Sequence, residues 1–212
     1  REELGLSLMP REHAVGSHLI PGDDDFAEAI PSLLRAFELN EDLMRRRPGD
    51  RAARFQTSAE SYLLSIAMFS KTKPDYRQAK RFGALAVELR GQLLEEDPND
   101  HRLRERLGAA LTVLGNAQLA AGDHGQAEGS FRRALALARA VEEKRRQAPG
   151  WHASQAHSHY GLAEIAKAGG NGGGACEHYR QALVYYDRLR SNRAFEKRQT
   201  LASRAAVDRC GK

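Results

Sequence analysis

Small and apolar residues recur along the chain at the spacing of one face of an α-helix. Four alanines start the pattern at spacings of 50, 48 and 48 residues, each with a second alanine seven residues later: Ala29 and Ala36, Ala79 and Ala86, Ala127 and Ala134, Ala175 and Ala182. A large side chain follows three residues after each pair, and another four residues further on. These offsets lie on one helical face, so the pattern predicts four similar helices.

A second helix precedes each of the three later alanine helices. Thirteen residues before the first alanine stands a pair of residues, the second of them small: Ile66-Ala67, Leu114-Gly115 and Leu162-Ala163. Helix-breaking residues separate the two patterns, and Asp75 and Asp123 are suited to be N-caps of the helices that follow. The pattern therefore predicts helical hairpins joined by tight turns.

The predicted helices form four units and a terminal helix in a single domain. The helices span 2–17, 25–46, 51–71, 75–96, 100–121, 124–147, 151–168, 173–190 and 193–209. The units cover about 1–48, 49–98, 99–149 and 150–190, and the cap covers 191–212. Pro10 should kink the first helix, and Pro31 should shorten or bend the start of the second. The last helix, with Phe195, Leu201, Ala202 and Ala205 on one side, is expected to cap the array.

These residues resemble the tetratricopeptide repeat (TPR) family, which pairs a large with a small residue in one helix and places Ala, an aromatic residue and Ala in the next. The third unit carries the pattern best, with Leu111, Leu114, Gly115, Gly122, Ala127, Phe131 and Ala134. The period exceeds the usual ~34 residues, and such long-period arrays resemble those attached to bacterial signalling proteins. The resemblance implies an all-α, right-handed α-α superhelix of four long hairpins and a C-terminal capping helix.

Composition and charge narrow the classes of function. The chain has 212 residues, with 33 Lys and Arg against 28 Asp and Glu, a net charge of +5. Basic runs at 45–47 and 144–146 end helices, where the helix dipole favours cations, and no aromatic residues interleave with them. Nucleic-acid binding is therefore disfavoured. No apolar run reaches the ~18 residues of a membrane span, and a start at Arg1 without a signal core indicates a cytoplasmic piece of a larger protein.

No catalytic or metal-binding motif stands out. Nucleotide-binding loops and nucleophile elbows are absent from the sequence, so we expect no enzyme activity, cofactor or metal. His152, His157 and His159 lack the spacing of ligands on one helical face and are interpreted as ordinary surface or groove histidines. Cys176 is expected to be a small core residue and Cys210 an exposed thiol. The glycine-rich segment 169–174 is interpreted as a flexible turn.

The TPR resemblance implies a ligand surface on the first helix of each hairpin, which lines the concave groove. The residues expected there are Leu64, Met68, Lys71, Thr112, Asn116, His157, Tyr160, Glu164 and Lys167. An apolar patch beside a mixed polar row suits a short amphipathic peptide. The alternative is that Leu64, Met68 and Leu119 only pack against neighbouring helices.

The sequence thus predicts a non-catalytic scaffold that binds a protein or peptide, with no membrane partner. One alternative is a regulatory or substrate-docking arm of a bacterial Ser/Thr protein kinase. Another is nucleic-acid binding through the basic helix ends. Self-association through the N-terminal unit also stays open, because Pro10 makes that unit a poor cap.

Overall fold

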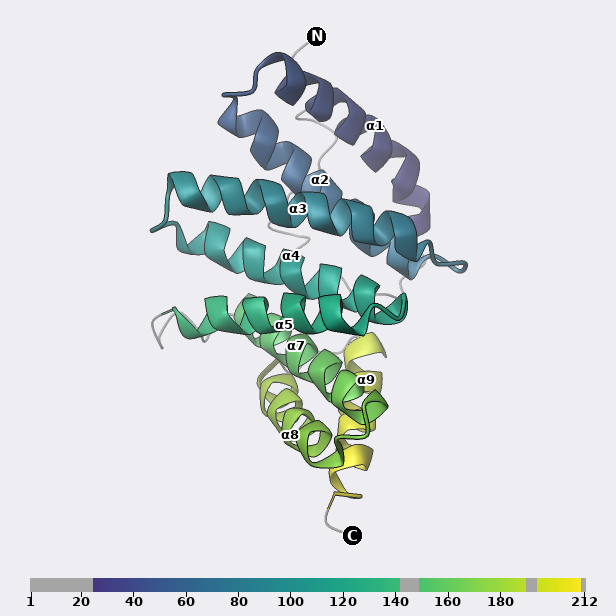
Figure 1. Ribbon diagram of the computed structural model, residues 1–212. Coiled ribbons are helices and arrows are strands. Elements are labelled where there is room, and N and C mark those ends of the chain that lie inside the picture. Colours follow the sequence, from purple (N-terminus) through teal and green to yellow (C-terminus); the bar gives the residue numbers. More distant parts are fainter. Residues whose placement is uncertain (1–24, 142–148, 190–193, 211–212) are drawn as a thin grey trace.

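The computed structural model describes residues 25–141, 149–189 and 194–210, and this part of the chain is all-α, without strands. Its helices are α1 (Asp25–Arg46), α2 (Arg51–Ser70), α3 (Tyr76–Glu96), α4 (His101–Ala120), α5 (His124–Arg139), α7 (Pro149–Ala168), α8 (Gly172–Leu189) and α9 (Ala194–Val207). Figure 1 shows these helices following one another from α1 at one end to α8 and α9 at the other.

The helix boundaries agree with the sequence prediction to within two residues, with one exception. α5 ends at Arg139 and not at 147: Ala140 is its C-cap, and the N–H of Val141 bonds to the carbonyl of Ala138, three residues back rather than four. α1 includes Pro31 and still begins at Asp25, so the proline does not shorten the helix. The predicted helix over 2–17, with Pro10, and the basic run at 144–146 lie outside the described residues.

Aspartate side chains fix the start of three helices. Asp75 accepts the N–H of Gln78 at 3.0 Å, which confirms its predicted role as the N-cap of α3. Asp50 and Asp100 cap α2 and α4 in the same way, 50 residues apart, each two residues after a proline. Asp123 precedes α5 but makes no capping bond, and its carboxylate pairs instead with Lys80 of α3. Asp123 therefore stands at the predicted N-cap position, but the prediction that its side chain caps the helix is wrong.

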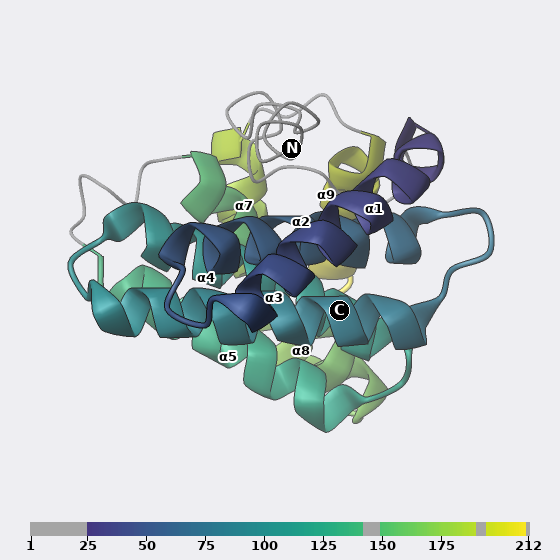
Figure 2. The same cartoon turned by 90° about the horizontal axis from the view of Figure 1, so that it is seen from above.

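Successive helices pack on one another, and alternate helices also meet. α2 contacts α4, and α4 contacts α7, so these three helices form a row along the stack. Figure 2, which looks along the stack from the α1 end, shows α1 in front, with α5 and α8 towards the bottom of the view and α7 and α9 towards the top. The apolar interior runs continuously from α1 to α5, and smaller clusters continue into α7 and α8.

One aromatic ring links the two parts of the interior. Phe131 of α5 is fully buried, and its two edges face Gly115 of α4 and Gly161 of α7. A Cβ atom on Gly115 would lie 2.6 Å from the ring, and one on Gly161 would also overlap it. Only glycine leaves room for the ring at both positions. The pairing of Gly115 with Phe131 agrees with the small and aromatic positions of the predicted repeat pattern.

Candidate binding surface on α4 and α7

α4 and α7 run side by side in the same direction. A Cβ atom on Gly108, in the first half of α4, would lie 2.9 Å from the ring of Trp151, at the start of α7. One turn later, the hydroxyl of Thr112 lies 2.8 Å from that of Ser154 and 3.2 Å from that of Ser158. The next turn of α4 carries Asn116. α4 and α7 are therefore in contact along these turns, and Thr112 is the predicted groove residue whose hydrogen bonds join them.

Four of the predicted groove residues lie in the interior. Leu64 and Met68 belong to the large apolar cluster, and Leu64 is completely inaccessible. Thr112 is buried where α4 meets α7. Its hydroxyl donates to the carbonyl of Gly108 and also lies within hydrogen-bond distance of the Ser154 hydroxyl. His157 is buried between α7 and the last two helices. In this structure a ligand does not reach these side chains.

The other five predicted groove residues are wholly or partly exposed. Lys71 forms the C-cap of α2 and is half-buried, and Asn116 is half-buried on α4. Among the residues that the structure describes, none hydrogen-bonds to the carboxamide of Asn116. Tyr160 and Glu164 are half-buried on α7, and Lys167 is exposed at its end. These five side chains are available to a ligand.

Tyr160, Glu164 and Lys167 form a polar cluster with Tyr179 of α8. The Tyr179 hydroxyl donates to Glu164, and the Lys167 Nζ lies 3.9 Å from the same carboxylate. The Tyr160 and Tyr179 rings pack edge to face with their centroids 5.9 Å apart. Burial, followed by the Glu164 charge, raises the pKa of Tyr160 to about 12. Both phenols therefore stay protonated at neutral pH and act as hydrogen-bond donors rather than as acid–base groups.

The histidines of α7 are not surface residues. His157 bonds through Nδ1 to Gln199 of α9 at 2.8 Å and lies 3.0 Å from the Tyr186 hydroxyl of α8. His159 lies 3.1 Å from His178 of α8, Nδ1 to Nδ1, and stacks on Tyr185. Burial, then the neighbouring His178 and Arg139 charges, lowers the pKa of His159 to about 4. The expectation of ordinary surface or groove histidines is wrong for His157, because its ring is buried and joins α7 to α8 and α9.

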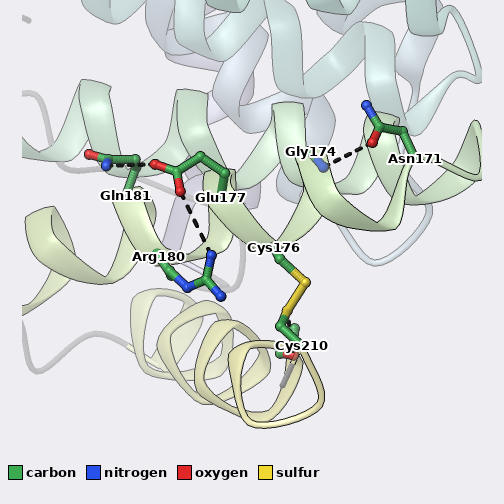
Figure 3. Close-up of polar contacts among 8 residues, drawn as sticks. Asn171, Gly174, Cys176, Glu177, Arg180, Gln181 and Cys210 are labelled. Carbon is green, nitrogen blue, oxygen red and sulfur yellow. Dashed lines mark hydrogen bonds and ion pairs between the residues drawn. A yellow bond between two sulfur atoms is a disulfide. The ribbon is translucent and has the colours of Figure 1, made fainter. Parts of the chain in front are cut away.

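The two cysteines form a disulfide, contrary to the sequence prediction. Cys176 lies in the second turn of α8 and Cys210 just beyond α9, and their Cα atoms are 5.9 Å apart (Figure 3). The bond adjoins a pocket of about 180 Å³ whose lining includes Lys167, Gly172 and Arg209. The sequence does contain a signal for this pairing. Antiparallel packing of the last two predicted helices brings the start of one next to the end of the other.

The glycine-rich segment is more ordered than a flexible turn. Gly170 has a φ of 76°, a left-handed conformation that favours glycine. Asn171 then caps α8 by accepting the N–H of Gly174 at 2.9 Å, as Figure 3 shows. The three glycines that follow form the first turn of α8.

The described residues lack two kinds of arrangement, a metal-holding cluster and a membrane-spanning helix. Residues 25–141, 149–189 and 194–210 contain no group of three or more His, Cys, Asp or Glu side chains arranged to hold a metal ion. None of the helices in these segments combines the length and the apolar character needed to cross a bilayer.

Comparisons with protein-family models, with curated proteins and with solved structures give no match.

Proposed function

We propose that this chain is a non-catalytic scaffold of the TPR kind, a right-handed superhelix of long helical hairpins that binds a segment of another protein. The repeated alanine pattern and the proline-aspartate links before α2 and α4 support a repeat architecture. The seating of Phe131 between two glycines supports it further, because a TPR-like pattern pairs an aromatic residue with small ones. A cytoplasmic location is part of this proposal.

The observation that carries the proposal is the environment of Asn116. Asn116 is half-buried on α4, and its carboxamide makes no hydrogen bond to any described residue. The buried polar atoms without a partner do not include those of this carboxamide, so it is open to solvent and available to a ligand. A peptide backbone supplies the donor and acceptor that a carboxamide pairs with. Tyr160 and the oppositely charged pair of Glu164 and Lys167 offer further contacts on α7. The ligand expected from this chemistry is a short amphipathic peptide with charges of both signs.

Acidic neighbours of the basic residues at the end of α1 favour a protein ligand over a nucleic acid. Arg45 and Arg46 in the last turn of α1 lie within 3.7 Å or less of Glu41 or Asp42 carboxylates. Acidic neighbours reduce the positive potential that phosphate contacts need. A docking arm of a larger signalling enzyme would use the same surface, since it too binds a protein segment.

A peptide selection tests this function directly. A phage-displayed library of random dodecapeptides is selected on the immobilised protein, and the affinity of the selected peptides is measured by fluorescence anisotropy. The double variant Asn116→Ala, Tyr160→Ala should weaken binding at least about tenfold. The matched control Asn99→Ala, Tyr76→Ala alters one residue of each type elsewhere and should change affinity less than about twofold. Equal affinity in both double variants would rule out this surface as the binding site.

A further inference from the structure

The helix α9 is attached to the rest of the protein mainly by polar groups and one covalent bond. Its main contacts are with α8. The buried side chains described on α9 are Gln199 and Ser203, both polar. Leu201, which the sequence placed with Ala202 and Ala205 on one side of this helix, is 64% exposed, and the two alanines are exposed too. The side chain of Phe195 lies outside the described residues.

Weak apolar burial makes the attachment of α9 depend on its other links. Burial of apolar surface contributes roughly 25 cal/mol per Å², and Ala206 and Val207 are only partly buried against Ala163, Ala175 and Tyr179. Near its N-terminal end, Gln199 bonds to His157 and Tyr186. Near its C-terminal end, the disulfide to α8 holds the chain. Loss of the disulfide leaves the C-terminal half of α9 with only the partly buried Ala206 and Val207 as apolar contacts and an exposed ion pair of Arg204 with Asp187.

The surroundings of the disulfide favour chemical exchange at this bond. Cys176 and Cys210 are both half-buried, so a reagent can reach the sulfur atoms from the adjoining pocket. Lys167 and Arg209 line that pocket, and Cys176 stands near the N-terminal, positive end of α8. Cations and a helix N-terminus stabilise a thiolate, which makes Cys176 the better leaving group.

We propose that the Cys176–Cys210 disulfide is a thiol–disulfide exchange site for a dithiol reductant, and that its reduction releases α9 from α8. A thiolate of the dithiol attacks Sγ of Cys210, the S–S bond breaks, and Cys176 leaves as a thiolate. The second thiol of the reductant then attacks its own sulfur in the mixed disulfide and expels Cys210. Two electrons and two protons pass to the protein, which gains two thiols, and the reductant becomes a disulfide.

A reversible bond also reconciles the disulfide with the cytoplasmic location proposed above. Reducing thiol pools keep most cytoplasmic cysteines reduced, and the disulfides that do form there are generally transient and catalytic or redox-sensing. A bond held near cations and open to a pocket has the features of that labile class. This inference rests on the proposed function for the cytoplasmic location, and Lys167 belongs both to the pocket and to the peptide-binding surface. Its tests follow the disulfide and α9, so they can fail while peptide binding holds, and the reverse.

Thiol counting and hydrogen exchange test the proposal on the whole chain. Protein purified without reductant should show no reactive thiols with Ellman's reagent under denaturing conditions, and two after treatment with dithiothreitol, because the chain has two cysteines. After reduction under native conditions, the amides of α9 should exchange at least about tenfold faster, while those of α4 and α5 stay unchanged. The double variant Cys176→Ser, Cys210→Ser should reproduce the reduced pattern without any reductant.

The pocket cations provide a kinetic test. Arg209→Gln should slow native reduction by dithiothreitol about threefold to tenfold, whereas Arg188→Gln, on the same helix pair but away from the pocket lining, should not. Equal rates of amide hydrogen exchange in α9 of the oxidised and the reduced protein would overturn the proposal and leave the disulfide a purely structural bond. Reduction that requires denaturant, free thiols in the air-oxidised protein, or faster exchange throughout the chain would overturn it as well.

Discussion

The two ends of the molecule are held together by different forces. From α1 to α5, buried Leu, Ile, Phe and Ala side chains form one continuous apolar cluster. From α7 to α9, the apolar clusters are smaller: Trp151 and Leu162 of α7 pack in clusters shared with α5, and the clusters with α8 and α9 contain mainly tyrosine and alanine. Buried hydroxyl, imidazole and carboxamide groups and a disulfide take the place of large aliphatic side chains there. Apolar packing is non-directional, whereas these contacts need one particular arrangement of the helices.

This difference determines which changes should alter the stability of each region. The stability of the first five helices depends on how well side chains fill the apolar interior, so changes in side-chain size should affect this region most. The last three depend on protonation and redox state as well as on packing. Two features make the contrast testable: a buried acid in α2, and the buried ring of Phe131 at the boundary between the two regions.

The largest expected effect comes from removing the ring that joins the two regions. Phe131→Ala should lower the free energy of unfolding by about 3–5 kcal/mol, because it leaves a cavity between Gly115 and Gly161. Urea unfolding followed by circular dichroism measures this loss. Leu201→Ala, on the exposed face of α9, should cost less than about 0.5 kcal/mol. A loss below about 1 kcal/mol for Phe131→Ala would mean that the ring is not tightly held.

The buried acid of the N-terminal region should make that region sensitive to alkali. Glu60 is fully buried, accepts a hydrogen bond from Asn40 at 2.6 Å, and its other oxygen has no partner among the described residues. Burial, opposed by the Asn40 bond, raises the pKa of Glu60 from 4.5 to about 7. The folded protein holds this proton more tightly than the unfolded chain. Its contribution is complete below pH 4.5 and is lost as the pH rises through 7.

Glu60→Gln should remove this dependence. The wild-type protein is expected to lose up to about 3 kcal/mol of stability between pH 4.5 and pH 8 relative to the variant. Denaturant midpoints measured across that range, with exposed Glu38→Gln as the control, give the difference. Parallel pH profiles for wild type and Glu60→Gln would show that the carboxylate is ionised at little cost.

The close approach of the helices at Gly161 gives the next effect. Gly161→Ala places a methyl group against Phe131 and should destabilise the protein by about 2 kcal/mol. Gly129→Ala is the matched control, because no atom lies within 4 Å of its added Cβ, and alanine there should raise stability by up to about 1 kcal/mol. Thermal unfolding of both variants compares the two sites. A stabilising Gly161→Ala would contradict the tight contact between α5 and α7.

The smallest effect should appear in the C-terminal region, with the opposite pH sign. The pKa of His159 is lowered from 6.5 to about 4, so the unfolded chain binds this proton more readily. The contribution is complete above pH 6.5 and is lost as the pH falls. Between pH 7 and pH 5 the loss should be about 1 kcal/mol after allowance for solvent screening.

His159→Gln should flatten that acid dependence, and exposed His101→Gln should leave it unchanged. Unfolding midpoints at pH 7, 6 and 5 measure the slope. If His159→Gln and the wild-type protein lost stability equally on acidification, the His159–His178 pair would not be the acid-sensitive contact of this region.

Much of the fold could be predicted because helices are local. The alanine spacing, the turns and Asp75 place helix ends within two residues at most boundaries. α5 was predicted too long, because residues after Arg139 continue a helical pattern whose end depends on a closing turn. The candidate surface was predicted only in part. Asn116 and Lys167 are accessible, but Leu64 and His157 are buried, since their exposure depends on helices far away in the sequence.

The sequence by itself determined which segments are helices and where similar helices recur, because periodicity and capping act over a few residues. Only the tertiary structure decided which groups meet across helices: Cys176 with Cys210, His159 with His178, and Phe131 with Gly161. It also decided that Glu60 is buried and that Leu201 is exposed. The physical reason is that these contacts depend on the rotation and crossing of whole helices, which side-chain spacing along one helix does not specify.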